Sequence, residues 1–168
     1  MQNMPTSHRR ALSQIDLDVI HHDGVWFSAG DKNYNGTTVD EDIARMDADY
    51  RSANERLNLS PSRMPYHLMG GPNGRLYYTL DSRAIGAHAL NNNTHTIGVC
   101  TFGNFVNQQP TLIAQAVVGG ACAITFRGLF RKVSIKGHYE VVSTECPGDT
   151  WPLWDDTVKI IASRFAGF

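Results

Sequence analysis

Histidine and cysteine side chains near the two ends of the chain have the chemistry of a metal site. His21 and His22 end a strand-like stretch, and His138 and Cys146 lie near the C-terminus, separated by seven residues. Imidazole nitrogen and thiolate sulfur are both good zinc ligands. A structural zinc takes four protein ligands, whereas a catalytic zinc takes three and leaves one position open. One histidine of the pair together with His138 and Cys146 would make three.

Each of these residues also has a plain structural interpretation. Successive side chains of a strand point to opposite faces, so only one of His21 and His22 can serve a given metal, and alternation alone does not choose between them. Taken singly, His138 reads as a hydrogen-bonded core histidine and Cys146 as a small buried residue. The Pro-Gly after the cysteine offers a bend that would bring His138 and Cys146 together.

Strands and a hairpin alternate with helices along the chain. Alternation of apolar and polar residues predicts strands at 15–22, 94–105 and 132–141, and Asn73-Gly74 predicts the turn of a hairpin. Thr38 and Glu41 form a capping box at the start of a helix over 38–58. That helix carries an apolar stripe at steps of three and four, formed by Ile43, Met46, Tyr50, Ala53 and Leu57.

Two further helices are predicted in the second half of the chain. The segment from Thr111 to about Phe130 is apolar nearly all round, which indicates a well-buried helix. Residues 155–165 form the last helix, with Asp155 and Asp156 at the end where the helix dipole favours them. The fold class is therefore α/β, a single domain with a central mixed β-sheet flanked by helices. We expect that domain to span residues 1–168, with 1–14 as an N-terminal extension.

The composition of the chain argues against nucleic acid and membrane as binding partners. The net charge of −1 gives no basic field that would attract nucleic acid. No apolar run approaches the ~18 residues needed to cross a bilayer. We therefore expect a monomer that binds neither nucleic acid nor membrane. Cys100 and Cys122 are interpreted as buried thiols, although a bridge between them stays open.

Five short motifs, in order, resemble the zinc-dependent N-acetylmuramoyl-L-alanine amidases of the type 2 family. That family includes the amidase-type lysozymes of tailed bacteriophages and the peptidoglycan recognition proteins. The resemblance runs from about Ile15 to the end of the chain and implies the fold of those proteins. Its motifs are IHH, YH, GAHA, N…TIGV and GHYEV…TECPG. Any one of them is weak evidence, whereas five in the family's order are specific.

The resemblance implies a zinc ion and its ligands. The family's metal ligands fall on His21, His138 and Cys146. Tyr66 matches the catalytic tyrosine, whose protonated phenol can donate a hydrogen bond. Thr144 occupies a position where relatives carry Lys or Thr beside the reacting carbonyl, and simple loop structure is the alternative for it.

The resemblance also implies the substrate. His88 and Asn93 match residues of the substrate groove, and the family hydrolyses the amide between N-acetylmuramic acid and L-alanine in peptidoglycan. The chain departs from the family at Asp23-Gly24 and in the stretch VWFSAGDKNYNG, residues 25–36. The shape of that end of the groove does not follow from the resemblance. Glu140 is interpreted as a structural residue or as a partner of a ligand histidine.

Three alternatives to a wall-degrading amidase are open. A peptidoglycan recognition protein that only binds is expected to lose a zinc ligand, and here all three are present. A recycling amidase acting on soluble muropeptides tends to carry aspartate in place of Cys146. A structural zinc protein would need a fourth ligand. Because the start of the sequence lacks a secretory signal, we expect a phage endolysin that stays in the host cytoplasm until it reaches the cell wall.

Overall fold

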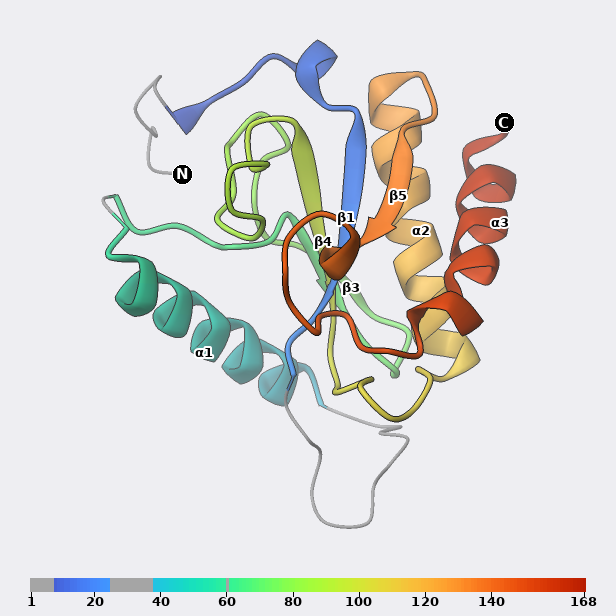
Figure 1. Ribbon diagram of the computed structural model, residues 1–168, viewed down its shortest axis with the longest axis horizontal. Helices are drawn as coiled ribbons and strands as arrows, with labels where there is room; N and C mark the ends of the chain where they lie inside the picture. The colour runs from blue at the N-terminus through green and yellow to red at the C-terminus, as the bar shows by residue number, and fades with distance from the viewer. Residues whose placement is uncertain (1–7, 25–37, 60) are drawn as a thin grey trace.

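Segments far apart in the sequence lie side by side in one mixed sheet. The computed structural model describes residues 8–24, 38–59 and 61–168. The sheet has five strands in the order β3-β2-β4-β1-β5 (Figure 1). The central strand β1 (Leu17–His22) pairs in parallel with β4 (Thr96–Thr101) and with β5 (Ser134–Gly137). The sheet is completed by β2 (Leu68–Gly70), parallel to β4, and by β3 (Leu76–Tyr78), antiparallel to β2. The predicted mixed sheet is confirmed.

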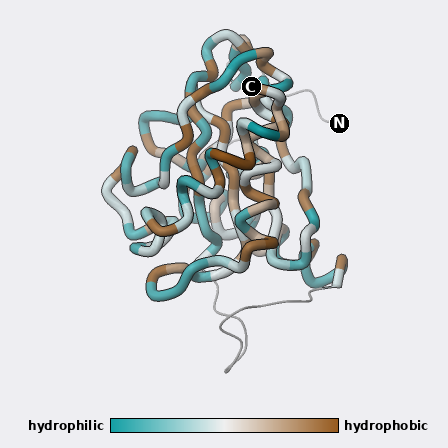
Figure 2. The backbone as a smooth tube through the Cα atoms, turned by 90° about the vertical axis from the view of Figure 1, so that its right-hand side faces the viewer, coloured by the Kyte–Doolittle hydropathy of each residue, from teal (hydrophilic) through white to brown (hydrophobic). Residues whose placement is uncertain are grey.

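Three helices of the described residues flank this sheet. Figure 1 shows α2 (Leu112–Leu129) and α3 (Asp155–Ala166) together on one side of it and α1 (Val39–Leu57) on the other. Short 3-10 turns lie at Leu12–Gln14, His138–Glu140 and Trp151–Leu153. The largest group of buried apolar side chains fills the space between the sheet, α2 and α3, and includes Trp151 and Trp154. Figure 2, which looks onto this side, shows hydrophobic segments running through the middle of the molecule.

The apolar composition of α2 reflects its place between the sheet and α3. Its inner face, with Val118, Cys122 and Phe126, is buried, whereas Leu112 and Ile124 are exposed. The helix is long and apolar enough to cross a membrane by length and composition, and 56% of that window is buried inside the fold. The expectation from the sequence that no apolar run approaches spanning length is therefore wrong for Leu112–Leu129. Burial against neighbouring elements is the reason for its hydrophobicity.

The predicted apolar stripe of α1 is only partly the buried face. Ile43 and Leu57 are about half exposed, at 51% and 44%, and of the stripe Ala53 alone is buried. The helix instead buries Asp42, whose carboxylate accepts hydrogen bonds from Asn73 Nδ2 (2.9 Å), Arg75 Nη1 (2.9 Å) and Tyr77 Oη (2.7 Å). A polar network therefore ties α1 to the β2–β3 hairpin.

Local signals in the sequence place most element ends correctly. Thr38 and Glu41 form the predicted capping box, and Thr111 caps α2. The hairpin turn lies between Gly70 and Leu76, with Gly74 at φ +85°. The strand predicted at 132–141 is wrong beyond Gly137, because the chain turns there into the 3-10 turn His138–Glu140. Cys100, Cys122 and Cys146 are all free, so no bridge joins the first two.

Candidate metal centre

Two histidines and a cysteine meet at the ends of β1 and β5. Ile20 pairs with Gly137 across these parallel strands, so the next residues, His21 and His138, leave the same edge of the sheet side by side. Their ring centroids are 4.2 Å apart. The loop after His138 returns Cys146 to this edge, with its Sγ 3.7 Å from His21 Nδ1. One possible ligand atom from each of the three residues lies within 4.8 Å of the others.

This donor set fits a zinc ion. Zinc–sulfur and zinc–nitrogen bonds of about 2.3 and 2.05 Å at a tetrahedral angle separate the two ligand atoms by about 3.5 Å. The 3.7 Å between Cys146 Sγ and His21 Nδ1 is close to that separation. Buried ring nitrogens are normally paired, yet His138 Nε2 is buried without a hydrogen-bond partner, as expected for a ring whose partner is a metal. Within the described residues this group has three members, which leaves a fourth position for water or substrate.

The structure separates the roles of the histidine pair. His21 is 1% exposed and faces the cluster. His22 lines the same cavity but lies outside the donor set, and its Nδ1 accepts a hydrogen bond from the backbone N–H of Phe105 (3.2 Å). The backbone N–H of His22 donates to Cys146 Sγ (3.4 Å) and so helps to hold the sulfur in place. One residue of the pair therefore belongs to the donor set, and the other supports it through its main chain.

Burial controls the protonation of all three side chains. Burial, with smaller contributions from His88 and His138, lowers the pKa of His21 well below its ordinary value. Burial lowers the pKa of His138 to about 4 and raises the pKa of the Cys146 thiol to about 12. The imidazoles are therefore neutral at pH 7, with lone pairs available for a metal. The thiol keeps its proton until a cation displaces it.

Two predicted catalytic residues line the cavity next to this cluster. The Tyr66 ring lies 5.0 Å from the His21 ring, centroid to centroid. Burial, followed by the nearby Cys100 and Cys146, raises the pKa of its phenol well above the ordinary value, so the hydroxyl keeps its proton and can donate a hydrogen bond. Thr144 is exposed and lines the same cavity, and its Oγ1 accepts from the Cys146 backbone N–H (3.3 Å). That bond gives Thr144 a part in the loop structure.

The two predicted groove residues occupy different places. His88 lines the cavity, is 8% exposed, and has its Nδ1 3.1 Å from His21 Nε2. Asn93 is not among the residues that line the cavity. Its Oδ1 accepts from the backbone N–H groups of His88 (2.9 Å) and Ala89 (2.8 Å), so it supports the segment that carries His88. A contact between Asn93 and substrate stays a prediction.

Glu140 has a structural place beside the metal centre. Its Oε2 accepts from the Gly137 backbone N–H (2.5 Å) and from Trp151 Nε1 (2.8 Å). These bonds fix the 3-10 turn that begins at His138 and fasten it to the buried Trp151. The carboxylate therefore acts through local structure, which agrees with the structural interpretation from the sequence.

The helix α1 supplies a wall of the cavity that sequence reasoning missed. Asp49, Ser52, Ala53 and Arg56 line it, and the cavity measures about 250 Å³. Burial, and next the neighbouring Asp23, raises the pKa of Asp49 to about 7. The polar members recur at steps of three and four, and this period was the signal that could have found them.

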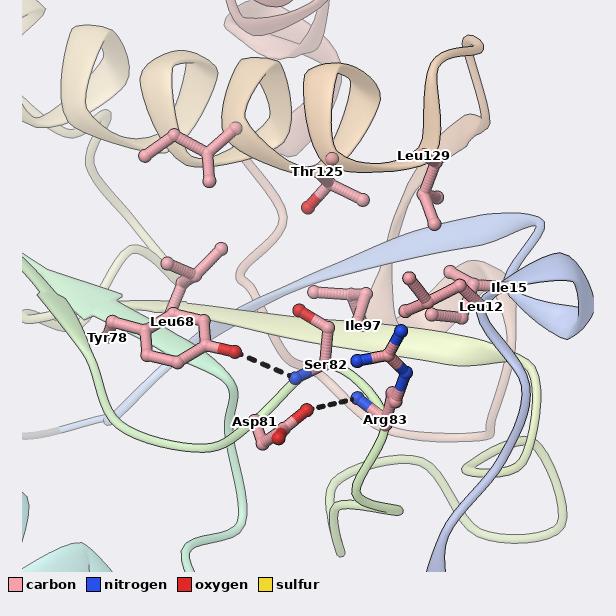
Figure 3. Close-up of a pocket in the computed structure, with 12 residues that line it drawn as sticks. Leu12, Ile15, Leu68, Tyr78, Asp81, Ser82, Arg83, Ile97, Thr125 and Leu129 are labelled. Atoms are coloured by element: carbon pink, nitrogen blue, oxygen red, sulfur yellow. Dashed lines mark hydrogen bonds between the residues drawn. The ribbon is translucent and has the colours of Figure 1, made fainter.

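A second cavity on the α2 side of the sheet has a different character. It measures about 290 Å³ and is lined mainly by apolar side chains of β2, β4, α2 and the segment before β1 (Figure 3). At its rim Ser82 N donates to Tyr78 Oη (2.9 Å) and Arg83 N donates to Asp81 Oδ1 (2.7 Å). Its lining holds neither histidine nor cysteine, whereas the candidate metal ligands all line the first cavity.

Comparison with known proteins gives a consistent result. The family model described as "N-acetylmuramoyl-L-alanine amidase" matches residues 11–149. A human protein named N-acetylmuramoyl-L-alanine amidase is 33% identical over 104 residues, which are 56% of this chain and 18% of that protein. Peptidoglycan-recognition protein SC2 of Drosophila simulans is 32% identical over 158 residues, covering 89% of this chain and 80% of that protein.

Solved structures agree on the fold. The X-ray structure of Apis mellifera PGRP-SA gives a TM-score of 0.72 at 19% identity, over 94% of this chain and 90% of that one. The amidase LysC from Clostridium intestinale gives a TM-score of 0.61 at 20% identity, over 88% of this chain and 84% of that one. The chain spans less than a fifth of the mammalian amidases that it matches, at 18% and 19% of their lengths. The family match covers most of the sequence, and this chain belongs to the N-acetylmuramoyl-L-alanine amidase family.

Proposed function

We propose that the protein is a zinc-dependent hydrolase that cleaves the amide between N-acetylmuramic acid and L-alanine of peptidoglycan. One observation carries the proposal: His21, His138 and Cys146 converge on one point beside Tyr66, within a cavity that has room for a substrate. Membership of the amidase family supports the reaction, and the donor set supports the metal.

Each residue has a role in this proposal. Zinc, when bound, would act as a Lewis acid on the amide carbonyl and make a water more acidic. The neutral rings of His21 and His138 and the thiolate of Cys146 would hold the ion. The Tyr66 phenol would donate a hydrogen bond to the oxygen that gains negative charge as the amide is attacked. Thr144, at the rim, would offer a weaker neutral donor.

The cavity wall suits a substrate that is both sugar and peptide. Its lining is mainly polar and carries charges of both signs, with Asp49 and Arg56 on α1. Muramyl peptides present hydroxyl, amide and carboxylate groups, which such a wall can bind through hydrogen bonds and ion pairs. We therefore extend the proposal to peptidoglycan fragments as ligands.

The test is digestion of purified peptidoglycan, followed by analysis of the new end groups. New amino groups of L-alanine are expected, and they should disappear after metal removal and return when zinc is added. New reducing sugar ends in their place would show a glycosidase and overturn the proposal. A Cys146→Ser variant serves as the matched inactive control, and His95→Leu controls for loss of a histidine outside the site.

Recognition without cleavage is the second candidate function. It is favoured by the match to a peptidoglycan-recognition protein over 89% of this chain. Pelleting with insoluble peptidoglycan separates the two candidates, because a recognition protein would bind the wall and release no new end groups. Cleavage of soluble muropeptides with no action on intact wall would instead favour a recycling amidase.

The biological setting is a further part of the proposal. We infer a cell-wall lytic role as a phage endolysin, acting as a monomer after release from the host cytoplasm. Cells that produce the protein should lyse when their membrane is permeabilised, and cells that produce Cys146→Ser should not. Lysis of equal speed in both would reject the endolysin role.

A further inference from the structure

His88 contacts the proposed metal ligand His21 directly. Its Nδ1 lies 3.1 Å from His21 Nε2, and the two rings meet edge to face with centroids 5.1 Å apart. Both side chains are buried. The Nε2 of His21 therefore faces His88, and its Nδ1 faces Cys146. The same ring is placed between a metal site on one side and a hydrogen-bond partner on the other.

A chain of hydrogen bonds continues from His88 to a backbone carbonyl. The Nε2 of His88 lies 3.3 Å from Thr96 Oγ1, and Thr96 Oγ1 donates to the Asn92 carbonyl oxygen at 2.9 Å. A carbonyl oxygen can only accept, so the single hydroxyl proton of Thr96 lies between these two oxygens. Toward His88 the hydroxyl can then only accept a hydrogen bond.

This constraint fixes the tautomer of both rings. His88 must carry its proton on Nε2 to donate to Thr96, and a neutral imidazole has one N–H, so His88 Nδ1 is an acceptor. His21 Nε2 must then be the donor of the bond to His88. The His21 Nδ1 is left as a lone pair that faces Cys146, as a metal ligand requires.

The surroundings hold His88 in this position. Gly98 of β4 lies against its ring, and a Cβ at residue 98 would come within 2.7 Å of His88 Cγ. Asn93 Oδ1 accepts from the backbone N–H groups of His88 and Ala89. The ring is therefore fixed at its backbone and on one face, and its two nitrogens are engaged at His21 and Thr96.

We propose that His88 is a positioning residue, which presets the tautomer and orientation of His21 through the chain from Asn92 O to Thr96, His88 and His21 Nε2. This inference rests on the proposed zinc site. It assigns His88 a role toward a ligand in addition to its place in the cavity lining. Partners of this kind commonly contribute 10–100-fold to metal affinity.

Zinc affinity of variants of the full chain, measured by competition with a chromophoric chelator, tests the role. His88→Leu removes the acceptor at similar size and should weaken zinc binding by about 10–100-fold. His88→Asn can place its Oδ1 near the former Nδ1 and should recover most of that loss. Thr96→Val should weaken binding less, and Thr96→Ser should leave it near wild type. His8→Leu, a histidine change outside the chain of bonds, is the control.

A substrate contact without a positioning role predicts the opposite pattern. In that case His88→Leu raises KM on a muramyl peptide and leaves zinc affinity unchanged, which would overturn the proposal. Equal losses in His88→Leu and His88→Asn would also overturn it, because the acceptor would then have no part.

The ring nitrogens of the metal-free wild-type protein provide a second readout. Nitrogen-15 NMR distinguishes protonated from unprotonated imidazole nitrogens, and both His21 and His88 are expected to carry the proton on Nε2. A proton on His21 Nδ1 would overturn the proposal, whatever the variants show. If wild-type protein binds no zinc, the proposed function fails, and this spectrum still decides whether the chain of hydrogen bonds has the proposed direction.

Discussion

The pH dependence of zinc affinity follows from the burial of the three ligands. Metal binding requires neutral imidazoles and a thiolate, and any proton that is present must leave. The pKa of His138 is lowered to about 4, the pKa of His21 is lowered well below its ordinary value, and the pKa of Cys146 is raised to about 12. Between pH 5 and about pH 7, below the range in which a zinc-bound water ionises, the binding of zinc should therefore release one proton, that of Cys146.

One released proton sets the magnitude. The apparent association constant should rise about tenfold per pH unit, hence about 100-fold from pH 5 to pH 7. If both histidines had their ordinary pKa of about 6.5, they would also be protonated at pH 5. Three protons would then leave, and the slope near pH 5 would approach about three. The two cases differ most clearly in the acidic half of the range.

Competition with a chelator of known proton affinity measures the slope at each pH. Cys146→Ser is the matched variant, because a hydroxyl binds zinc without losing a proton in this range; its affinity should be much lower and nearly independent of pH. A slope near three at pH 5 in the wild type would show that burial does not keep the histidines neutral. A slope of one that persists in Cys146→Ser would show that the proton comes from another group.

Three further predictions concern catalysis and stability. Tyr66→Phe should lose on the order of 100-fold or more in kcat on a muramyl peptide while it keeps its zinc content, and a wild-type rate would remove the phenol from the mechanism. Asp42→Ala should lower the free energy of unfolding in urea by about 2–4 kcal/mol, because it removes the carboxylate that accepts from three donors of the hairpin. The control Ile43→Ala, at a half-exposed residue, should lower it by less than about 1 kcal/mol. Equal losses in the two variants would show that the network does not stabilise the fold. Metal-free protein should lose stability as the pH falls from about 6.5 to 4, since the unfolded chain binds protons there that the folded chain excludes. The histidines with lowered pKa values are His21, His22, His67, His88 and His138. The buried carboxyls Asp18 and Asp49 have raised pKa values and act in the opposite sense. A thermal midpoint that rises on acidification would show that these carboxyls outweigh the histidines.

The residue types of the donor set could be predicted, and their convergence could not be derived without the family resemblance. Strand alternation left His21 and His22 equivalent. The choice between them depends on the register of β1 against β5, where Ile20 lies opposite Gly137. That register is a contact between residues more than 100 positions apart, and no local pattern encodes it.

Elements fixed by neighbouring residues were predicted well, whereas elements fixed by distant partners were not. The N-terminal caps of α1 and α2 depend on side chains within three residues of the helix start. For α1, both residues of the capping box, Thr38 and Glu41, could be identified from the sequence. The end of β5 depends on Glu140, which accepts from Trp151 eleven residues later. The buried face of α1 depends on Asp42 and the hairpin donors more than 30 residues away. The spacing of apolar residues cannot identify the buried face of a helix when that face is anchored by the hydrogen bonds of a carboxylate.

The burial that the sequence could not reveal has two opposite effects on the same site. It keeps the rings of His21 and His138 neutral, so their lone pairs stay available to a metal well below pH 7. It also raises the pKa of Cys146, so the thiolate is stable only when a cation is beside it. A fully solvent-exposed site would lose the histidines to acid and expose the thiolate to oxidation at high pH. Burial at the end of β1 thus makes the donor set selective for a bound cation, at the expense of acid stability in its absence.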